Sequence, residues 1–516
     1  MSRTRTPSVA IIGAGMSGLC MAAQLKMAGI DTFTIYEKAG DLGGTWRDNT
    51  YPGLACDIPS RFYQFTFSPK PDWTHLFSPG AEIWSYFDSV ADRFGLKEHI
   101  EFNTKVVAAE FADNCWRLRT DAGDESTVDF LISATGILHH PRYPQIAGLD
   151  TFEGAVFHSA RWDHDVTVEG KRVAVIGTGS TGAQIVTALA GVTGRLELFQ
   201  RTAQWVFPLP NPSYSRRTHT LQKYVPGLSG LTYRCMRMLF EFFARALIKP
   251  GLRRRFIART CRTNLLTVRD PELRRKLTPD YQPMCKRLVI SSGFYKAVQK
   301  PNVEVVTAEI DHLVPEGIVT ADGVLHEVDV LVLATGFDAH AYMRPLELVG
   351  DRGLTLSEAW EDGAHAYHTV ALPGFPNFFM LMGPHSPVGN YSLTAIAESQ
   401  VEHIMGWIYR WRDGELSAVA PTEQATARFN ALMRASMPGT VWVTGCQSWY
   451  LGKDGVPELW PWTPDRHRAM LRHVDPDDFH VRHDLGDSAF PAIVTDRRNP
   501  LLSSRRPEHD STANCS

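Results

Sequence analysis

One pattern occurs twice in this chain and limits its fold more than any other feature. An apolar run leads into a G-x-G-x-x-G turn and then directly into a helical run, once from residue 8 and again from residue 172. The glycines are Gly13, Gly15 and Gly18 in the first copy and Gly177, Gly179 and Gly182 in the second. Such glycines permit a tight turn, a close approach of backbone to a pyrophosphate, and close packing of helix on strand. The sequence therefore predicts an α/β protein with two Rossmann-like dinucleotide-binding domains.

The strand after each glycine turn ends differently in the two copies. The first ends in Glu37, about 20 residues beyond the glycines, and the second ends in Gln200, Arg201 and Thr202. A carboxylate accepts hydrogen bonds from a ribose 2′-hydroxyl and repels a 2′-phosphate, which an arginine and a hydroxyl would instead attract. We therefore expect FAD in the first site and NADPH in the second. The alternative for Arg201 is a solvated charge at a strand end.

Two nucleotide sites in one chain imply hydride transfer from a nicotinamide to a flavin. Each half ends in a strand followed by Ala-Thr-Gly, at residues 127–136 and 328–336, and small residues suit backbone that lies against a cofactor. No pair of the eight cysteines has CxxC spacing, which argues against a zinc site or a disulfide relay. We expect the cysteines to be unpaired thiols in a reducing cytoplasm.

Composition removes several other classes of partner. A net charge of −3 without a long basic run gives nucleic acid no electrostatic support. Residues 1–8 leave no room for a signal peptide, and no run of about 20 apolar residues predicts a membrane-spanning helix. We expect a cytoplasmic protein without a metal site or an integral membrane segment, as a monomer or weak homodimer.

Three further motifs resemble those of the type I Baeyer–Villiger monooxygenases, which are related to the flavin-containing monooxygenases. Residues 152–163 match the F-x-G-x-x-x-H-x-x-x-W-(P/D) fingerprint at every fixed position. Residues 43–57 match the longer signature that begins with Gly-Gly-Thr-Trp and continues through Tyr-Pro-Gly to Asp57. Lys286 and Arg287 stand where the family has its active-site Lys-Arg pair. With the glycine turns, the resemblance covers most of residues 8–340.

The resemblance implies that FAD and NADPH activate dioxygen for transfer to a ketone or aldehyde, giving an ester or lactone. The reactive species would be a flavin C4a-peroxide, and Arg287 would stabilise the anionic adduct that it forms with the carbonyl group. Asp57 would hold Arg287, and Lys286 would join Arg201 at the 2′-phosphate. Further residues are expected to contact the cofactors: Gly44, Thr45, Trp46 and Tyr63 at the FAD, and Thr178, Ser180 and Thr181 at the NADPH. A structural ion pair is the alternative for Arg287 and Asp57.

We expect the FAD domain to comprise residues 7–151 and 340–497, the NADP domain residues 152–339, and a disordered tail residues 498–516. Long basic helices within 211–281 suggest a lid or substrate subdomain, and the amphipathic stretch 231–248 favours core packing over a membrane-surface role. His158 and Trp162 are interpreted as linker residues. A tryptophan among Trp449, Trp460 and Trp462 could reach the substrate pocket, but the pattern does not say which.

Two other classes stay open. The same fold could oxygenate nitrogen or sulfur in amines or sulfides. A flavoprotein that serves as a binding module, a plain NADPH oxidase or a flavin reductase would be favoured if Asp57 or Arg287 lay far from the flavin. The substrate cannot be read from the fold.

Overall fold

The computed structural model describes residues 5–387, 389, 391–449 and 451–483. Its N-terminal domain is built on a parallel sheet in the order β19-β7-β1-β2-β3. The strands are β1 (Val9–Ile12), β2 (Phe33–Tyr36), β3 (Ile100–Glu101), β7 (Phe130–Ser133) and β19 (Phe378–Met380). Helix α1 (Met16–Met27) follows β1 directly, and eight of its twelve residues are buried. Because β19 comes from the second half of the chain, this domain is assembled from two separate segments.

The second domain repeats this arrangement. Its parallel sheet has the order β13-β10-β9-β17-β8, and helix α4 (Ser180–Leu189) follows the glycine turn after β9. The strands are β8 (Ala155–His158), β9 (Arg172–Ile176), β10 (Arg195–Phe199), β13 (Val303–Val306) and β17 (Val330–Leu333). Strands such as β17 are buried along their whole length, as expected for a parallel sheet covered on both faces. The prediction of two Rossmann-like domains is confirmed.

Smaller sheets and helices complete the two domains. The additional strands are β4 (Val106–Ala112), β5 (Cys115–Thr120), β6 (Glu125–Val128), β11 (Val206–Phe207), β12 (Val289–Ile290), β14 (Ile310–Val314), β15 (Gly317–Thr320), β16 (Leu325–Glu327), β18 (Glu347–Val349), β20 (Ala418–Pro421) and β21 (Phe479–Arg482). The additional helices are α2 (Thr45–Asp48), α3 (Gly80–Arg93), α8 (Pro271–Lys276), α9 (Phe294–Ala297), α10 (Leu356–Ala359), α11 (Leu393–Arg412), α12 (Glu423–Ala435) and α13 (Pro464–Arg472). Within the described residues, 3₁₀ turns span Lys97–His99, Ser159–Arg161, Asp351–Gly353, Val441–Val443 and Pro476–Asp478.

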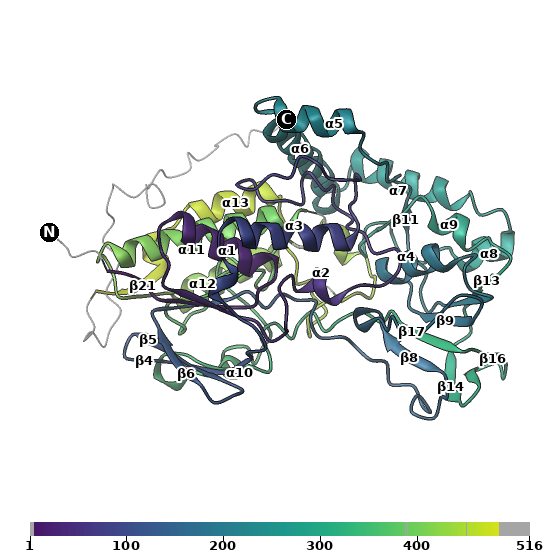
Figure 1. Cartoon of the computed structure of the whole chain (residues 1–516), viewed down its shortest axis with the longest axis horizontal. Coiled ribbons are helices and arrows are strands. Elements are labelled where there is room, and N and C mark those ends of the chain that lie inside the picture. Colours follow the sequence, from purple (N-terminus) through teal and green to yellow (C-terminus); the bar gives the residue numbers. More distant parts are fainter. Residues whose placement is uncertain (1–4, 388, 390, 450, 484–516) are drawn as a thin grey trace, which may run out of the picture.

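The two domains lie side by side along the long axis of the molecule, with α2 between them (Figure 1). A helical insertion of the second domain stands above this junction and contains α5 (Arg216–Tyr224), α6 (Leu228–Ile248) and α7 (Leu252–Leu265). The long helix expected at residues 231–248 is therefore present. No helix in the described part of the chain is long and apolar enough to cross a membrane.

The expectation that all cysteines are unpaired is wrong. Cys285 and Cys446 form a disulfide, although 161 residues separate them in sequence. Met437, Trp442 and Cys446 pack in the hydrophobic cluster of the second domain, so the fold brings this C-terminal stretch against the segment that carries Cys285. Spacing along the chain gave no sign of this pair. The tail expected to be disordered, residues 498–516, lies outside the described residues.

Candidate active site

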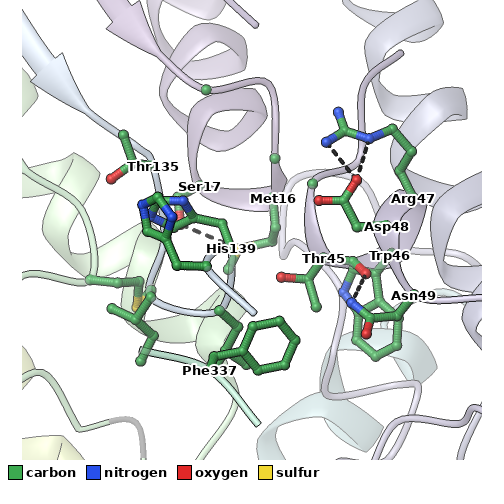
Figure 2. A pocket seen from close by; sticks show the side chains of 18 of the residues that line it. Met16, Ser17, Thr45, Trp46, Arg47, Asp48, Asn49, Thr135, His139 and Phe337 are labelled. Atoms are coloured by element: carbon green, nitrogen blue, oxygen red, sulfur yellow. Dashed lines mark hydrogen bonds and ion pairs between the residues drawn. The ribbon is translucent and has the colours of Figure 1, made fainter. Parts of the chain in front are cut away.

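A cavity of about 770 Å³ lies where the two domains meet. It is bounded by the carboxyl ends of parallel strands, including Ile12 at the end of β1 and Ala334 directly after β17, which is where open α/β sheets bind their ligands. Figure 2 shows Met16 and Ser17 of α1 and Thr45 and Trp46 of α2 around this space. The same figure shows Thr135, His139 and Phe337, from the segments after β7 and β17, around the same space, with His139 beside Ser17.

The first glycine turn has the shape that a bound pyrophosphate requires. Gly13 has a φ of +108°, and a Cβ there would lie 2.8 Å from the carbonyl oxygen of Ala134. A Cβ on Gly18 would lie 1.9 Å from the oxygen of Gly13, so no larger residue could let α1 pack so closely. Gly13 and Gly15 line the cavity, and no side chain caps the start of α1. The free end of this helix therefore remains available to an anion.

The second turn has the same construction. Gly177 has a φ of +118°, and a Cβ there would lie 2.3 Å from the oxygen of Ala334, while a Cβ on Gly182 would lie 2.0 Å from the oxygen of Gly177. Thr178 donates a hydrogen bond to the carbonyl oxygen of Thr202, 2.7 Å away. These residues, like Gly18, shape the turns without lining the cavity. Three of the predicted contact residues do line it: Gly179, Ser180 and Thr181.

Glu37 lies in the cavity wall and is 4% exposed. Its Oε2 accepts a hydrogen bond of 2.9 Å from the backbone N–H of Ala14, inside the first glycine turn. Its Oε1 accepts one of 3.0 Å from Ala39 and forms an ion pair of 3.1 Å with Arg47. The carboxylate therefore braces the turn as well as facing the space where a ribose would lie.

Arg201 and Lys286 lie near each other at the second site, outside the residues that line the cavity. The pKa of Lys286 is lowered, first by burial and also by the positive charge of Arg201, against the opposing effect of Asp280. The Lys286 ammonium stands over the ring of Tyr281, 4.9 Å from its centroid. Two cations at the end of β10 suit a phosphate dianion better than a neutral hydroxyl.

Arg287 and Asp57 meet in the wall of the cavity, as the motifs predicted. The Arg287 Nε and Nη2 atoms donate to the two carboxylate oxygens of Asp57 at 2.8 and 2.7 Å. The side chains are 30% and 22% exposed, so the pair faces the cavity and is not enclosed in the core. A bidentate bond of this kind fixes the plane of the guanidinium group.

The loop that carries Asp57 is attached to the second domain. The Tyr51 hydroxyl donates to Gln184 Oε1 at 2.9 Å, and Gln184 Nε2 donates to the carbonyl oxygen of Ala55 at the same distance. At Gly53, where φ is +81°, a Cβ would lie 2.8 Å from the Gln184 carbonyl oxygen. Sequence reasoning missed Gln184, because nothing marks this residue of α4 as the partner of a loop about 130 positions earlier.

Aromatic residues form much of the remaining wall. Trp46 Nε1 donates to the Tyr63 hydroxyl at 3.1 Å, and both residues line the cavity with Gly44 and Thr45, as expected. Trp449 also lines it, whereas Trp460 is buried against Trp462, so Trp449 is the tryptophan that the sequence could not single out.

Burial lowers the pKa of two histidines near the cavity. His139, which sequence reasoning missed, bonds the carbonyl oxygen of Tyr342 at 2.7 Å, and burial lowers its pKa to about 4. His158 is 1% exposed, accepts a hydrogen bond from the Ala160 N–H and bonds the Gly336 carbonyl oxygen. Burial also lowers the pKa of His158. Its contacts are those of a packed linker residue, as the sequence interpretation held, and Trp162 packs beside it on Phe157.

Comparisons with known proteins agree with this site. Residues 6–344 match the model of the flavin-binding monooxygenase-like family. An uncharacterised monooxygenase of Mycobacterium tuberculosis strain H37Rv is 60% identical over 93% of this chain and 97% of its own length. A Baeyer–Villiger monooxygenase of Streptomyces coelicolor is 40% identical over 92% of each chain. The crystal structure of cyclohexanone monooxygenase from Rhodococcus sp. Phi1 bound to NADP+ is 30% identical and covers 93% of this chain and 99% of its own, with a TM-score of 0.84.

Proposed function

Because this chain belongs to the flavin-binding monooxygenase-like family and, within it, to the Baeyer–Villiger monooxygenases, we propose that it converts small ketones or aldehydes to esters or lactones. One atom of dioxygen enters between the carbonyl carbon and a migrating carbon. The other atom leaves as water with two electrons from NADPH and a proton. The observation that carries the proposal is the Arg287–Asp57 pair in the cavity between the two nucleotide folds.

The two glycine turns and the uncapped helices after them fit FAD in the first domain and NADP in the second. Bound FAD, once reduced by NADPH, supplies the activated oxygen. Residues assigned to the FAD are Gly13, Gly15, Gly18, Glu37, Gly44, Thr45, Trp46, Asp57 and Tyr63. Residues assigned to the NADPH are Gly177, Thr178, Gly179, Ser180, Thr181, Gly182, Arg201, Thr202 and Lys286, with Arg287 next to both cofactors.

Arg287 is the catalytic residue of this proposal. Its guanidinium stays protonated at any working pH and stabilises the negative charge that develops on oxygen when the carbonyl group is attacked. Asp57 is a positioning residue, since its carboxylate accepts two hydrogen bonds from Arg287 and so fixes the plane of the guanidinium group in the cavity wall. Tyr51 and Gln184 hold the Asp57 loop on α4, so the position of Arg287 depends on contact between the domains.

The proposal also includes the domain boundaries, the cellular compartment and the oligomeric state. We assign residues 7–151 and 340–497 to the FAD domain, of which residues 484–497 lie outside the described part of the chain, and residues 152–339 with the helical insertion to the NADP domain. The enzyme uses NADPH, dioxygen and a small carbonyl compound in the cytoplasm, as a monomer or weak homodimer.

The test compares Arg287→Ala, Arg287→Lys and Asp57→Asn with the wild type. Ester formation from a panel of ketones is measured with labelled dioxygen, and reduction of bound flavin by NADPH is measured without oxygen. We expect Arg287→Ala to lower ester formation at least about a hundredfold, as loss of a stabilising donor does elsewhere, with little change in flavin reduction. Arg287→Lys retains the charge without the bidentate geometry, so it should lose much of the rate, and Asp57→Asn should fall between.

Three outcomes would contradict the proposal. Unchanged ester yield in Arg287→Ala would remove Arg287 from the mechanism. Oxygenation of sulfides or amines without any ester would assign the enzyme to heteroatom chemistry. Hydrogen peroxide equal to the NADPH consumed, whatever substrate is added, would indicate an oxidase.

A further inference from the structure

The helical insertion exposes an unusual amount of apolar surface. Ten of the nineteen large hydrophobic side chains that are exposed in the described part of the chain lie between residues 221 and 266. Single exposed hydrophobic residues are normal on a protein surface, but a concentration within one subdomain marks an interaction site.

Helix α6 is apolar on two opposite sides. Its inner side packs on the N-terminal domain, where Phe240 and Tyr233 lie 5.4 and 5.3 Å from the ring of Phe62. Its outer side carries Leu231, Met238, Leu239 and Phe242, which are 45–59% exposed. Their spacing of three, four, seven and eight residues places them in one stripe along the helix. Core packing explains the inner side only.

The neighbouring helices extend this outer stripe at both ends. At the end of α5, Leu221, Tyr224 and Val225 are exposed, and Gln222 of α5 donates a hydrogen bond to Thr232 of α6. At the other end, Leu252 and Phe256 of α7 are 80% and 63% exposed. The Arg253 guanidinium lies over the ring of Phe242, 4.3 Å from its centroid, and so joins α7 to the stripe. We call residues 221–256 on this side the insertion face.

The helical insertion that carries this face is also strongly basic. Residues 216–266 contain twelve arginines and lysines but only one acidic residue, Glu241, which is 5% exposed on the inner side of α6. The whole chain, by contrast, carries a net charge of −3. No salt bridge within the described residues involves any of the twelve cations. Arg254 is partly buried and donates to the carbonyl oxygens of Ala246, Leu247 and Gly439. Exposed cations such as Arg253, Arg255 and Arg259 face solvent, where an external anionic partner can reach them.

We propose that the insertion face docks this enzyme on the surface of an anionic lipid bilayer. Exposed leucine, methionine and phenylalanine flanked by arginine are the composition of helices that lie in the plane of a membrane interface. Nucleic acid would use the cations but leave the apolar stripe exposed to water. A second copy of this face would bring two sets of like charges together, which disfavours a symmetric dimer. Only a bilayer with acidic headgroups satisfies both features.

Docking in this orientation has a structural consequence for the cavity. The inner side of α6 meets Phe62, whose ring lies 5.2 Å from that of Tyr391, and Tyr391 lines the cavity. One helix thus contacts the bilayer on its outer side and the surroundings of the cavity on its inner side. The docking surface is nevertheless independent of the oxygenation chemistry and can be tested without it.

Cys235 lies within the stripe and is the exposed free cysteine among the described residues, which makes it a natural site for a polarity-sensitive fluorophore. The labelled protein is a C115S/C515S variant with FAD bound, mixed with vesicles of phosphatidylcholine alone or with phosphatidylglycerol. We expect co-sedimentation and a blue shift of the label with the anionic vesicles only, both weakened by salt.

Each cation near such a surface changes the partitioning of the protein onto the bilayer about fivefold. Combining Arg253→Gln, Arg255→Gln and Arg259→Gln should therefore weaken binding about a hundredfold.

A second variant with Phe242→Ser and Phe256→Ser should also lose the blue shift. The matched control carries Val324→Ser and Leu325→Ser, which replace two exposed hydrophobic residues at the start of β16, outside the helical insertion. This control should bind vesicles like the wild type. NADPH consumption in solution checks that each variant is folded.

Three results would overturn the proposal. Binding that ignores lipid charge, or that survives both sets of insertion-face variants, would remove the surface from membrane docking. A label shift that grows with protein concentration without vesicles, together with dimers in light scattering, would assign the face to a second copy of the chain. The emission of the label could already be blue-shifted in the free protein and return to that of a solvent-exposed label when residues 484–516 are removed. That result would mean that the C-terminal tail covers the insertion face.

Discussion

At the residue scale, neighbouring groups fix the positions of the charged side chains in this site. Arg287 is oriented by two bonds to one carboxylate, and Glu37 is held by backbone N–H groups and Arg47. The motifs predicted contact between Arg287 and Asp57, and the structure shows their side chains hydrogen-bonded. The same patterns did not show that Glu37 braces the first glycine turn, which depends on an N–H group and carries no side-chain signature.

A variant of Arg201 tests how the enzyme distinguishes NADPH from NADH. We expect Arg201→Ala to raise the KM for NADPH about tenfold and to change the KM for NADH little, because one charge-assisted hydrogen bond to the 2′-phosphate is lost. Steady-state NADPH and NADH oxidation measures both values. The matched control is Arg195→Ala, which removes an exposed arginine at the other end of β10. Equal effects on the two cofactors would mean that Arg201 does not contact the 2′-phosphate.

At the element scale, α6 and α13 meet through a group of charges that the sequence did not indicate. Both carboxylate oxygens of Glu241 are buried, and the carboxylate lies against Asp465 at the start of α13. Burial, and then the charge of Asp465 on α13, raise the pKa of Glu241 to about 7, against the opposing charge of Arg468. An ionised acid buried on this packed side of α6 is a structural cost at neutral pH.

The pH dependence follows from this raised pKa. Glu241 favours the folded state fully below its ordinary pKa of 4.5 and loses that contribution as the pH rises through about 7. Glu241→Gln should therefore match the wild type near pH 4.5 and exceed it at pH 8, by at most about 3 kcal/mol. Melting curves at the two pH values measure the difference. Glu272→Gln, an exposed acid of the same insertion, is the control, and an equal gain at both pH values would contradict the assignment.

At the scale of the whole molecule, the features that could be predicted from the sequence are those that a local pattern of residues specifies. The repeated strand, glycine turn and helix predicted both domains and both cofactors, since each unit is specified within about 30 residues. The contacts of Gln184 with the Asp57 loop, the choice of Trp449 and the Cys285–Cys446 disulfide were not predictable in this way. Each joins segments far apart in sequence, and one chain without its fold carries no record of such contacts.

The disulfide gives the last prediction, because it fastens the C-terminal segment of Trp449 to the segment of Arg287. His340 bonds Glu458 and the carbonyl oxygen of Trp449, both at 2.9 Å, so the segment has a second attachment. Cys446→Ser should therefore lower stability by about 2–5 kcal/mol, and raise the KM for NADPH only a few-fold.

A reducing agent should reproduce both changes in the wild type and have no further effect on Cys446→Ser. Cys261→Ser, which removes a buried free thiol of the same hydrophobic cluster, should keep the response to reductant. Thiol titration of the unfolded, unreduced wild type shows whether the Cys285–Cys446 disulfide is present. With the disulfide present, six of the eight cysteines react. If all eight react, the two segments are held by packing and His340 alone, and the loss of stability in Cys446→Ser has another cause.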